Sequence, residues 1–509
     1  MSPTFRSNET RSIDSNRLVL ENSREPAAIC EQRASDKHES LSSSQDLADE
    51  GRLRLKIDMM ILPTVSMLYL VCFLDRANIG NARIAGLEED LGLKGSDYNV
   101  ILSIFYISYV LFQLPSNILC KRLGPGWFLP GITTLFGFVS LGTAFVHNKA
   151  QVAGVRVALG AFEAGIFSGT AYYLSRWYRR DELALRLAIY ASMVPLANAF
   201  GGLLASGILS LSHLGGLHGW RMIFTIEGVI TCGVGLIGFL TLTDRPETAR
   251  WLTGEEKELI TARIRSDHIG HCEPLDRLDL TKVLRGIFSP ITVVVSFIFF
   301  LHNITAGSLA FFFPTIIRSI YPDKSVVEQQ LRTAPPHVLG VLFEVMFAYL
   351  SWRLDRRLVL LIASCPLLIV GFALLLGVEN PQVRYGATFF ITSGMNPAAP
   401  LCMTVVSANV VTDTARASAL ATHGMMGALG SLVATWSFLP FDAPYYRIGY
   451  GINLAASGII MVTSPLLLFW MMTNNGKREG EDAGKELEGM NEREIEDLDW
   501  KHPGFRWHS

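Results

Sequence analysis

Long apolar runs separated by short polar gaps fill the chain between about residues 59 and 472. A helix that crosses a bilayer needs about 20 mostly apolar residues, so this pattern predicts twelve membrane-spanning helices. The first six are expected at 59–81, 98–119, 127–147, 150–175, 187–211 and 220–242. The last six are expected at 288–313, 337–352, 358–377, 385–411, 418–439 and 449–472, with the eighth helix the shortest of all.

A charged block at 243–287 divides the twelve helices six plus six. Basic residues recur at nearly equal offsets in the two halves. Arg122 and Arg353 are 231 residues apart, and Arg186 and Arg416 are 230 residues apart. Chance spacing of loop arginines is the alternative, but it does not explain why the charged block falls between the halves.

This repeat predicts an all-α membrane protein with 12 transmembrane helices in two pseudo-symmetric six-helix bundles, at 56–242 and 288–472. The block at 243–287 is expected to be a cytosolic linker. The polar, Ser-rich stretch 1–55 is expected to be a disordered cytosolic tail, because its low hydrophobicity cannot support a packed core. The charged stretch 473–509 is expected to be a second cytosolic tail.

Basic residues also predict the orientation of the chain, because short cytosolic loops are enriched in Lys and Arg. The basic gaps follow helices 2, 4, 8 and 10, which all face one side if there are twelve spans, and the central block adds more. Both termini are therefore expected in the cytosol. Within the linker, the run from Thr253 to Arg265 predicts a surface helix with a threonine cap.

Composition agrees with a membrane protein and excludes several functions. The chain is 50% hydrophobic and 18% charged, whereas soluble proteins carry about 25% charged residues. A net charge of −2 excludes a broadly basic nucleic-acid binder. The seven cysteines show no framework spacing, so no structural disulfide is expected, and no CxxC or HExxH pattern indicates a metal site. No GxxxxGK[ST] loop occurs, so direct use of ATP is not expected.

Charged residues inside apolar helices carry the most functional information, because each costs about 2.5–3.5 kcal/mol on insertion scales. Asp75 and Arg76 are neighbours in the first helix. Neighbours on a helix point about 100° apart, so each is expected to meet a different helix. The alternative is that this helix ends at Leu74 and that both charges are interfacial.

The fourth helix carries Arg156 and Glu163, which are seven residues apart and therefore share a face. Its glycines (154, 160, 165 and 169) predict close packing against neighbouring helices. A carboxylate there either neutralises an arginine of another helix or takes up a proton. A permanent structural ion pair remains the alternative.

Other polar residues in apolar runs are weaker candidates. Tyr109 and Gln113 share a face of the second helix and are expected to line a cavity, with ordinary packing of the tyrosine as the alternative. A lone buried histidine such as His302 is more often a packed residue than a site. The remaining members of this buried polar set are Asn78, Asn81, Tyr106, Glu227, Asn303 and Glu344.

These motifs resemble the major facilitator superfamily, within the anion:cation symporter group, and most of all its fungal allantoate and nicotinate permease branch. The resemblance rests on FLDRANIGNARIAGL in helix 1, FYISYVLFQLPSNILCKRLGP through helix 2, RVALGAFEAGIFSGTAYYLSRWYRRDELALR around helix 4, GWRMIFTIEG, DRPETARWLTGEE and the C-terminal HPGFRW. Together these segments span nearly the whole chain.

The resemblance also implies gating loops. The superfamily's loop after helix 2 usually carries an Asp, whereas Lys121 and Arg122 stand there in this chain. The equivalent loop in the second half keeps Asp355, followed by Arg356. Because the eighth helix is short, the expectation for this second loop is weaker.

By the same resemblance, Arg76 holds the substrate carboxylate, and Asp75 and Glu163 handle protons. Asn78, Tyr109, Gln113, His302 and Asn303 complete the expected substrate site. The implied function is proton-coupled symport of a small organic anion by a plasma-membrane protein, expected to be a monomer with no cofactor beyond the proton gradient, no nucleic-acid partner and no metal. The alternatives are an exporter of an acidic secondary metabolite, a nutrient sensor that does not transport, and a membrane-embedded enzyme.

Overall fold

The computed structural model describes residues 50–178, 180–211, 216–267, 280–410, 413–479, 500 and 505–508. The chain divides into two compact units, Met1–Met60 and Ile61–Ser509. The second unit contains all of the predicted site residues. The expected N-terminal tail up to residue 49, together with Cys30 and Cys272, lies outside the described residues.

The first half of the chain is helical throughout its described residues. A helical span covers Glu50–Asp90, and it bends within the π-helical turn η1 (Arg83–Leu87), where Gly86 has a φ of 101° that favours glycine. It ends in α2 (Glu88–Asp90). The next helices are α3 (Asp97–Leu123), α4 (Pro125–Thr143), α5 (Lys149–Glu163), α6 (Ile166–Ser175), α7 (Arg180–Ala191), α8 (Met193–Leu209) and α9 (Trp220–Thr241).

Three short helices belong to the charged central block: η2 (Pro246–Thr248), α10 (Gly254–Asp267) and α11 (Leu280–Ile287). α10 confirms the predicted surface helix. The hydroxyl oxygen of Thr253 accepts a hydrogen bond from the backbone N–H of Glu256 at 3.3 Å, and the side chain of Glu256 accepts one from the N–H of Thr253 at 2.8 Å. This reciprocal capping box satisfies two backbone donors at the start of the helix.

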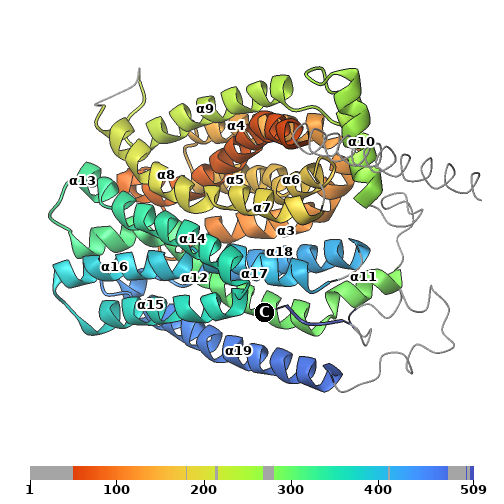
Figure 1. The fold of residues 1–509 in the computed structure, drawn as a ribbon. Coiled ribbons are helices and arrows are strands. Elements are labelled where there is room, and N and C mark those ends of the chain that lie inside the picture. The colour runs from red at the N-terminus through yellow and green to blue at the C-terminus, as the bar shows by residue number, and fades with distance from the viewer. Residues whose placement is uncertain are drawn as a thin grey trace, which may run out of the picture. The chain divides into compact units, whose positions relative to one another are not determined.

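The second half repeats the helical plan. Its elements are α12 (Pro290–Ile320), α13 (Val326–Leu331), α14 (Ala334–Leu354), α15 (Arg357–Gly377), α16 (Pro381–Met395), α17 (Ala398–Ala408), α18 (Asp413–Ala434), η3 (Pro440–Asp442) and α19 (Arg447–Glu479). In Figure 1 the helices α3 to α9 lie together, and α12 to α19 lie together beside them.

Ten helical spans among the described residues are long and apolar enough to cross a membrane. The predicted third and eleventh helices correspond to α4 and α18, which are helical but contain several Gly, Ser and Thr residues that lower their apolar character. The expected all-α membrane fold is confirmed. The expectation of a short eighth helix is wrong, because α14 has 21 residues and begins before the predicted boundary.

Two predicted helices are broken near their middle. The predicted fourth helix divides into α5 and α6 beside Gly165, and the predicted tenth divides into α16 and α17 at Asn396 and Pro397. Proline removes a backbone donor and glycine weakens a helix, so each break has a local cause. The second segments begin at Ile166 and Ala398, which are 232 residues apart. This offset is close to the spacing of the basic loop residues.

Glycines hold several helix pairs close together. A Cβ atom on Gly160 of α5 would meet the carbonyl oxygen of Phe105 in α3, and one on Gly430 of α18 would meet that of Phe300 in α12. Gly154, by contrast, has open space where its side chain would be. The glycines of the fourth helix thus fulfil the packing prediction except at this position.

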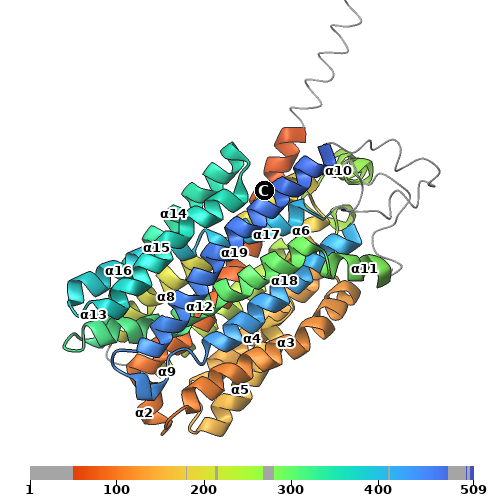
Figure 2. The same cartoon turned by 90° about the horizontal axis from the view of Figure 1, so that it is seen from below.

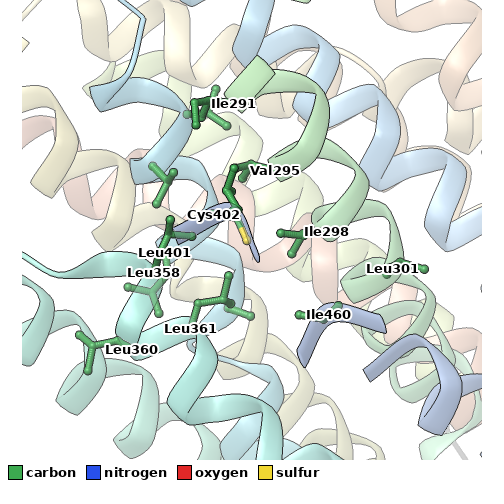
Figure 3. Packing of buried hydrophobic residues seen from close by; sticks show 14 of the residues in the cluster. Ile291, Val295, Ile298, Leu301, Leu358, Leu360, Leu361, Leu401, Cys402 and Ile460 are labelled. Carbon is green, nitrogen blue, oxygen red and sulfur yellow. The ribbon is translucent and has the colours of Figure 1, made fainter. Parts of the chain in front are cut away.

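The apolar core of the second half lies between α12, α15, α17 and α19. Figure 3 shows Val295 and Ile298 of α12 beside Leu401 and Cys402 of α17, with Ile460 of α19 near them. The five described cysteines are free thiols: Cys72, Cys120, Cys232, Cys365 and Cys402.

The C-terminal segment docks against this same core. The side-chain amide of Asn475 in α19 forms two hydrogen bonds of 2.9 Å with the backbone of Trp507. Asn409, at the end of α17, forms two of 2.8 Å with the backbone of His508. Residues 505–508 of the predicted C-terminal tail are therefore anchored to the helices, through the buried Trp507 and the two asparagines.

The helices of the second unit run between two ends of the molecule. One end carries α13 and α2 and is called the α13 end; the other carries α10 and α11 and is called the α11 end (Figure 2). The described C-terminal residues Trp507 and His508 contact helices near the α11 end, where α17 and α19 end.

Candidate functional site

Asp75 and Arg76 lie inside the first long helix, and each contacts a different set of neighbours. Arg76 Nε donates a hydrogen bond to Glu163 Oε2 of α5 at 2.7 Å. Asp75 accepts one from the hydroxyl of Ser140 in α4, and its Oδ2 lies 4.0 Å from Nη1 of Arg156 in α5. Because this helix continues to Asp90 and both side chains are buried, the alternative of interfacial charges is excluded.

The Glu163 carboxylate is enclosed by protein. Its side chain has 0% exposed surface, whereas that of Arg76 keeps 10%. Oε2 also accepts a hydrogen bond of 3.2 Å from the thiol of Cys72, one helical turn before Arg76. Of this pair, only the Arg76 side chain keeps any exposed surface.

Aromatic rings surround the guanidinium of Arg76. Its central carbon lies 4.6 Å from the ring centre of Phe73, 4.9 Å from that of Tyr109 and 5.3 Å from that of Phe105. Faces of aromatic rings attract cations electrostatically. They stabilise the cation in an apolar setting without supplying a second carboxylate.

Around Arg76 and Glu163, buried acidic groups outnumber buried basic groups. Three carboxyl groups, Asp75, Glu163 and Glu227, accompany two guanidiniums, those of Arg76 and Arg156. Full ionisation would leave a net charge of −1. Neither oxygen of Glu227 has a hydrogen-bond partner among the described residues. One bound proton would neutralise the set.

The other predicted substrate residues lie in several places. The ring of Tyr109 contacts Arg76. Asn78 is buried and accepts a hydrogen bond of 3.4 Å from Asn81. Asn303 donates to the carbonyl of Phe299 at 2.8 Å, one turn earlier in α12.

Gln113 and His302 are buried, and among the described residues Gln113 Oε1 and His302 Nδ1 have no hydrogen-bond partner.

The predicted gating residues lie at helix ends. Lys121 and Arg122 occupy the last turn of α3. Asp355 caps α14 in a left-handed conformation, and Arg356 precedes α15.

The sequence reasoning missed several buried polar residues, among them His337, Arg384 and His423. His423 of α18 stacks on Phe299 of α12, with ring centres 4.0 Å apart. Phe299 also faces His302, at 5.8 Å. The signal in the sequence was a single histidine in an apolar helix, and this is no stronger than the signal of His302.

Polar contacts join the two halves at the α13 end. Asn99 of α3 donates to the carbonyl of Thr435 at 2.6 Å and to that of Phe438 at 3.3 Å. The hydroxyls of Ser103 and Thr435 are 2.8 Å apart, and Trp436 Nε1 donates to Ser103 at 2.9 Å. These hydrogen bonds connect the first turns of α3 to the residues at and after the end of α18.

Close backbone packing reinforces the contact at this end. A Cβ atom on Gly80 would lie 2.5 Å from the carbonyl oxygen of Phe311 in α12. Gln330 Nε2 of α13 donates to the carbonyl of Asn81 at 3.1 Å. The two halves are therefore held together at the α13 end.

Ionisable residues paired in the interior of a helical membrane protein mark a functional site, and substrate or ion pathways are one such site. Comparison with known proteins agrees: residues 65–435 match the Major Facilitator Superfamily. The chain therefore belongs to this family.

The relatives are transporters. An uncharacterized transporter of Schizosaccharomyces pombe is 32% identical over 462 residues, 90% of each chain. The high-affinity nicotinic acid transporter of Saccharomyces cerevisiae is 32% identical over 430 residues, which is 84% of this chain and 79% of the relative. The crystal structure of a D-xylose–proton symporter shares the fold, with a TM-score of 0.60, 14% identity, and coverage of 79% of this chain and 97% of the other. The protein is thus an integral membrane transporter and not an enzyme.

Proposed function

We propose that this transporter is a proton-coupled symporter of a small organic anion, a carboxylate or ureido acid, and that it belongs to the fungal allantoate and nicotinate permease branch of the anion:cation symporters. The observation that carries the proposal is the buried ion pair in which the Arg76 side chain, 10% exposed, meets the fully enclosed carboxylate of Glu163. The Saccharomyces cerevisiae relative transports nicotinic acid, itself a carboxylate, which supports this class of cargo.

Charge balance gives the reason for coupling to protons. Bringing an anion into a cell with a negative interior works against the membrane potential by about 2.3 kcal/mol per 100 mV. A proton that travels with the anion removes this cost. In the proposed cycle the proton binds Glu163 or Asp75, and the substrate carboxylate replaces Glu163 as the partner of Arg76.

The contacts at the α13 end support a proposal of alternating access. If both termini are cytosolic, as the basic gaps predict, the α13 end faces the outside of the plasma membrane, and its contacts close that face. Loading from outside then requires the contacts of Asn99 and Gln330 with the opposite half to break. The proton gradient is the proposed driving force, with no cofactor and a monomer as the working unit.

Uptake measurements in cells test the proposal. Arg76→Ala is expected to abolish uptake of radiolabelled carboxylates while the protein still reaches the membrane, because the anion loses its cation. The matched control is Arg447→Ala, which removes an exposed arginine at the start of α19 and is expected to leave uptake unchanged. Normal uptake by the Arg76→Ala variant would contradict the assignment.

A second variant tests coupling separately from binding. Glu163→Gln keeps the shape of the side chain but cannot lose a proton. It is expected to abolish accumulation driven by an inward proton gradient while preserving exchange of labelled for unlabelled substrate. Accumulation that keeps the pH dependence of the unaltered protein would count against a proton site at Glu163.

A further inference from the structure

The two oxygens of the Glu163 carboxylate have unequal partners. Oε2 accepts hydrogen bonds from Arg76 Nε at 2.7 Å and from the thiol of Cys72 at 3.2 Å. Oε1 is buried as well, yet it has no hydrogen-bond partner among the described residues. Buried polar atoms nearly always have a partner, so an exception calls for an explanation. A place for a proton is one such explanation, because binding at Oε1 leaves both hydrogen bonds of Oε2 intact.

The first long helix brings Cys72 to Glu163. Cys72 precedes Arg76 by four residues, so the two side chains share a face of that helix and reach the same oxygen. A buried cysteine usually packs as a small apolar residue. Cys365 of α15 is an example, because its thiol donates to the carbonyl of Leu361, one turn earlier in the same helix, at 3.3 Å. Cys72 differs, because its acceptor is a carboxylate of another helix.

Few groups besides Arg76 and Cys72 act on Glu163. Other titratable or charged side chains face either Glu163 or the neighbouring carboxyl group of the first helix. They are Asp75 of the first helix, Tyr106 and Tyr109 of α3, Arg156 of α5 and Glu227 of α9. Among the described residues, only Arg76 and Cys72 donate a hydrogen bond to the Glu163 carboxylate. Once Arg76 turns to a substrate anion, the thiol is the donor that remains.

We propose that Cys72 is a positioning residue for proton coupling. Its thiol stays hydrogen-bonded to Oε2 when Arg76 exchanges Glu163 for the substrate, so that Oε1 is the oxygen that takes the proton. The proton forms an O–H bond at Oε1 and neutralises the carboxylate, while the thiol keeps its own hydrogen. This rests on the proposed function, because Glu163 must be a proton site and Arg76 must be the partner of the substrate.

The thiol also affects the pH at which the proton binds. A hydrogen-bond donor stabilises a carboxylate more than a protonated carboxyl group, so Cys72 favours the ionised form of Glu163. Without this donor the proton binds at higher pH. The pH midpoint is the external pH that gives half of the maximal proton-driven uptake. Because a thiol is a weak donor, we expect its loss to raise this midpoint by about half to one pH unit, roughly a three- to tenfold change in proton binding.

Uptake of radiolabelled nicotinate, allantoate and pantothenate over a range of external pH tests this role, with the midpoint taken for the probes that the unaltered protein accumulates. Cys72→Ala removes the donor and is expected to raise the midpoint. Cys72→Ser keeps a donor at the same place and is expected to return the midpoint to that of the unaltered protein or below it. The matched control is Cys365→Ala, which removes another buried thiol and its hydrogen bond and is expected to leave the midpoint unchanged.

Infrared spectra of the purified full-length protein detect the hydrogen bond without any need for transport. The S–H stretching band moves to lower frequency as the thiol donates to a stronger acceptor. Glu163→Gln replaces the carboxylate with a neutral amide. We therefore expect the band of Cys72 to move to higher frequency in this variant, and the band of Cys365 to stay in place. Because Glu163→Gln retains the thiol, this measurement also decides the matter if Cys72→Ala fails to fold.

The outcomes separate this inference from the proposed function. An unchanged midpoint in Cys72→Ala, a Cys72→Ser variant that behaves like the alanine variant, or a thiol band that does not respond to Glu163→Gln overturns the role of Cys72. If any of these is found while Glu163→Gln still abolishes proton-driven accumulation, the proposed function stands. If the unaltered protein accumulates no carboxylate, or accumulates it regardless of the proton gradient, both are overturned.

Discussion

The Arg76–Glu163 pair is expected to show strong energetic coupling. The two side chains meet at 2.7 Å, and neither is more than 10% exposed. At an effective dielectric constant of about 20, opposite charges some 4 Å apart attract by about 4 kcal/mol. Removing one member of a buried pair costs about 3–5 kcal/mol, because the other charge is left without its partner.

The perturbation is a set of three variants: Arg76→Met, Glu163→Gln and the double substitution. Arg76→Met leaves a fully enclosed carboxylate alone and is expected to cost the most. Glu163→Gln leaves a guanidinium that three aromatic rings still contact, so its cost is expected to be smaller. The double variant removes both charges, and we expect it to be more stable than the sum of the single changes by about 2–3 kcal/mol.

Thermal unfolding of the purified protein in detergent measures this coupling. For a chain of this length, the unfolding entropy of globular proteins corresponds to a Tm change of about 1 °C per kcal/mol. Arg76→Met is therefore expected to lower Tm by about 3–5 °C, and the double variant to recover about 2–3 °C relative to additivity. Additivity to within about 0.5 kcal/mol, as for distant independent sites, would refute the reasoning.

Two further predictions concern packing. Trp507→Ala removes a buried side chain, a change that costs about 3–5 kcal/mol in cores. Faster hydrogen exchange is therefore expected at the backbone amides of 505–508. The control is Trp352→Ala, which removes a side chain that is 77% exposed and should leave this exchange unchanged. Gly80→Val places side-chain atoms against the carbonyl of Phe311 and is expected to lengthen spin-label distances across the α13 end. Gly142→Val, which meets open space, should leave these distances unchanged, and equal distances in both variants would contradict the role of this contact.

The sequence by itself determined the class of fold. Apolar length and the cost of placing charge in a bilayer are properties of single segments, so they predict the helices and single out Asp75, Arg76 and Glu163 without knowledge of neighbours. The expectation that Asp75 and Arg76 meet different helices holds in part: Asp75 accepts a hydrogen bond from Ser140 of α4, but its second partner and the partner of Arg76 both lie on α5.

Tertiary structure alone decided which groups meet. The thiol of Cys72 on Glu163, the stacking of His423 on Phe299, and the docking of Trp507 on Asn475 each join segments far apart in the chain. Hydrogen bonds and ring contacts act over a few ångströms, and the pattern of residues along the sequence does not give the distances between side chains of different helices. Local chemistry therefore shows which residues are costly to bury, whereas the packed helices determine which partners offset that cost.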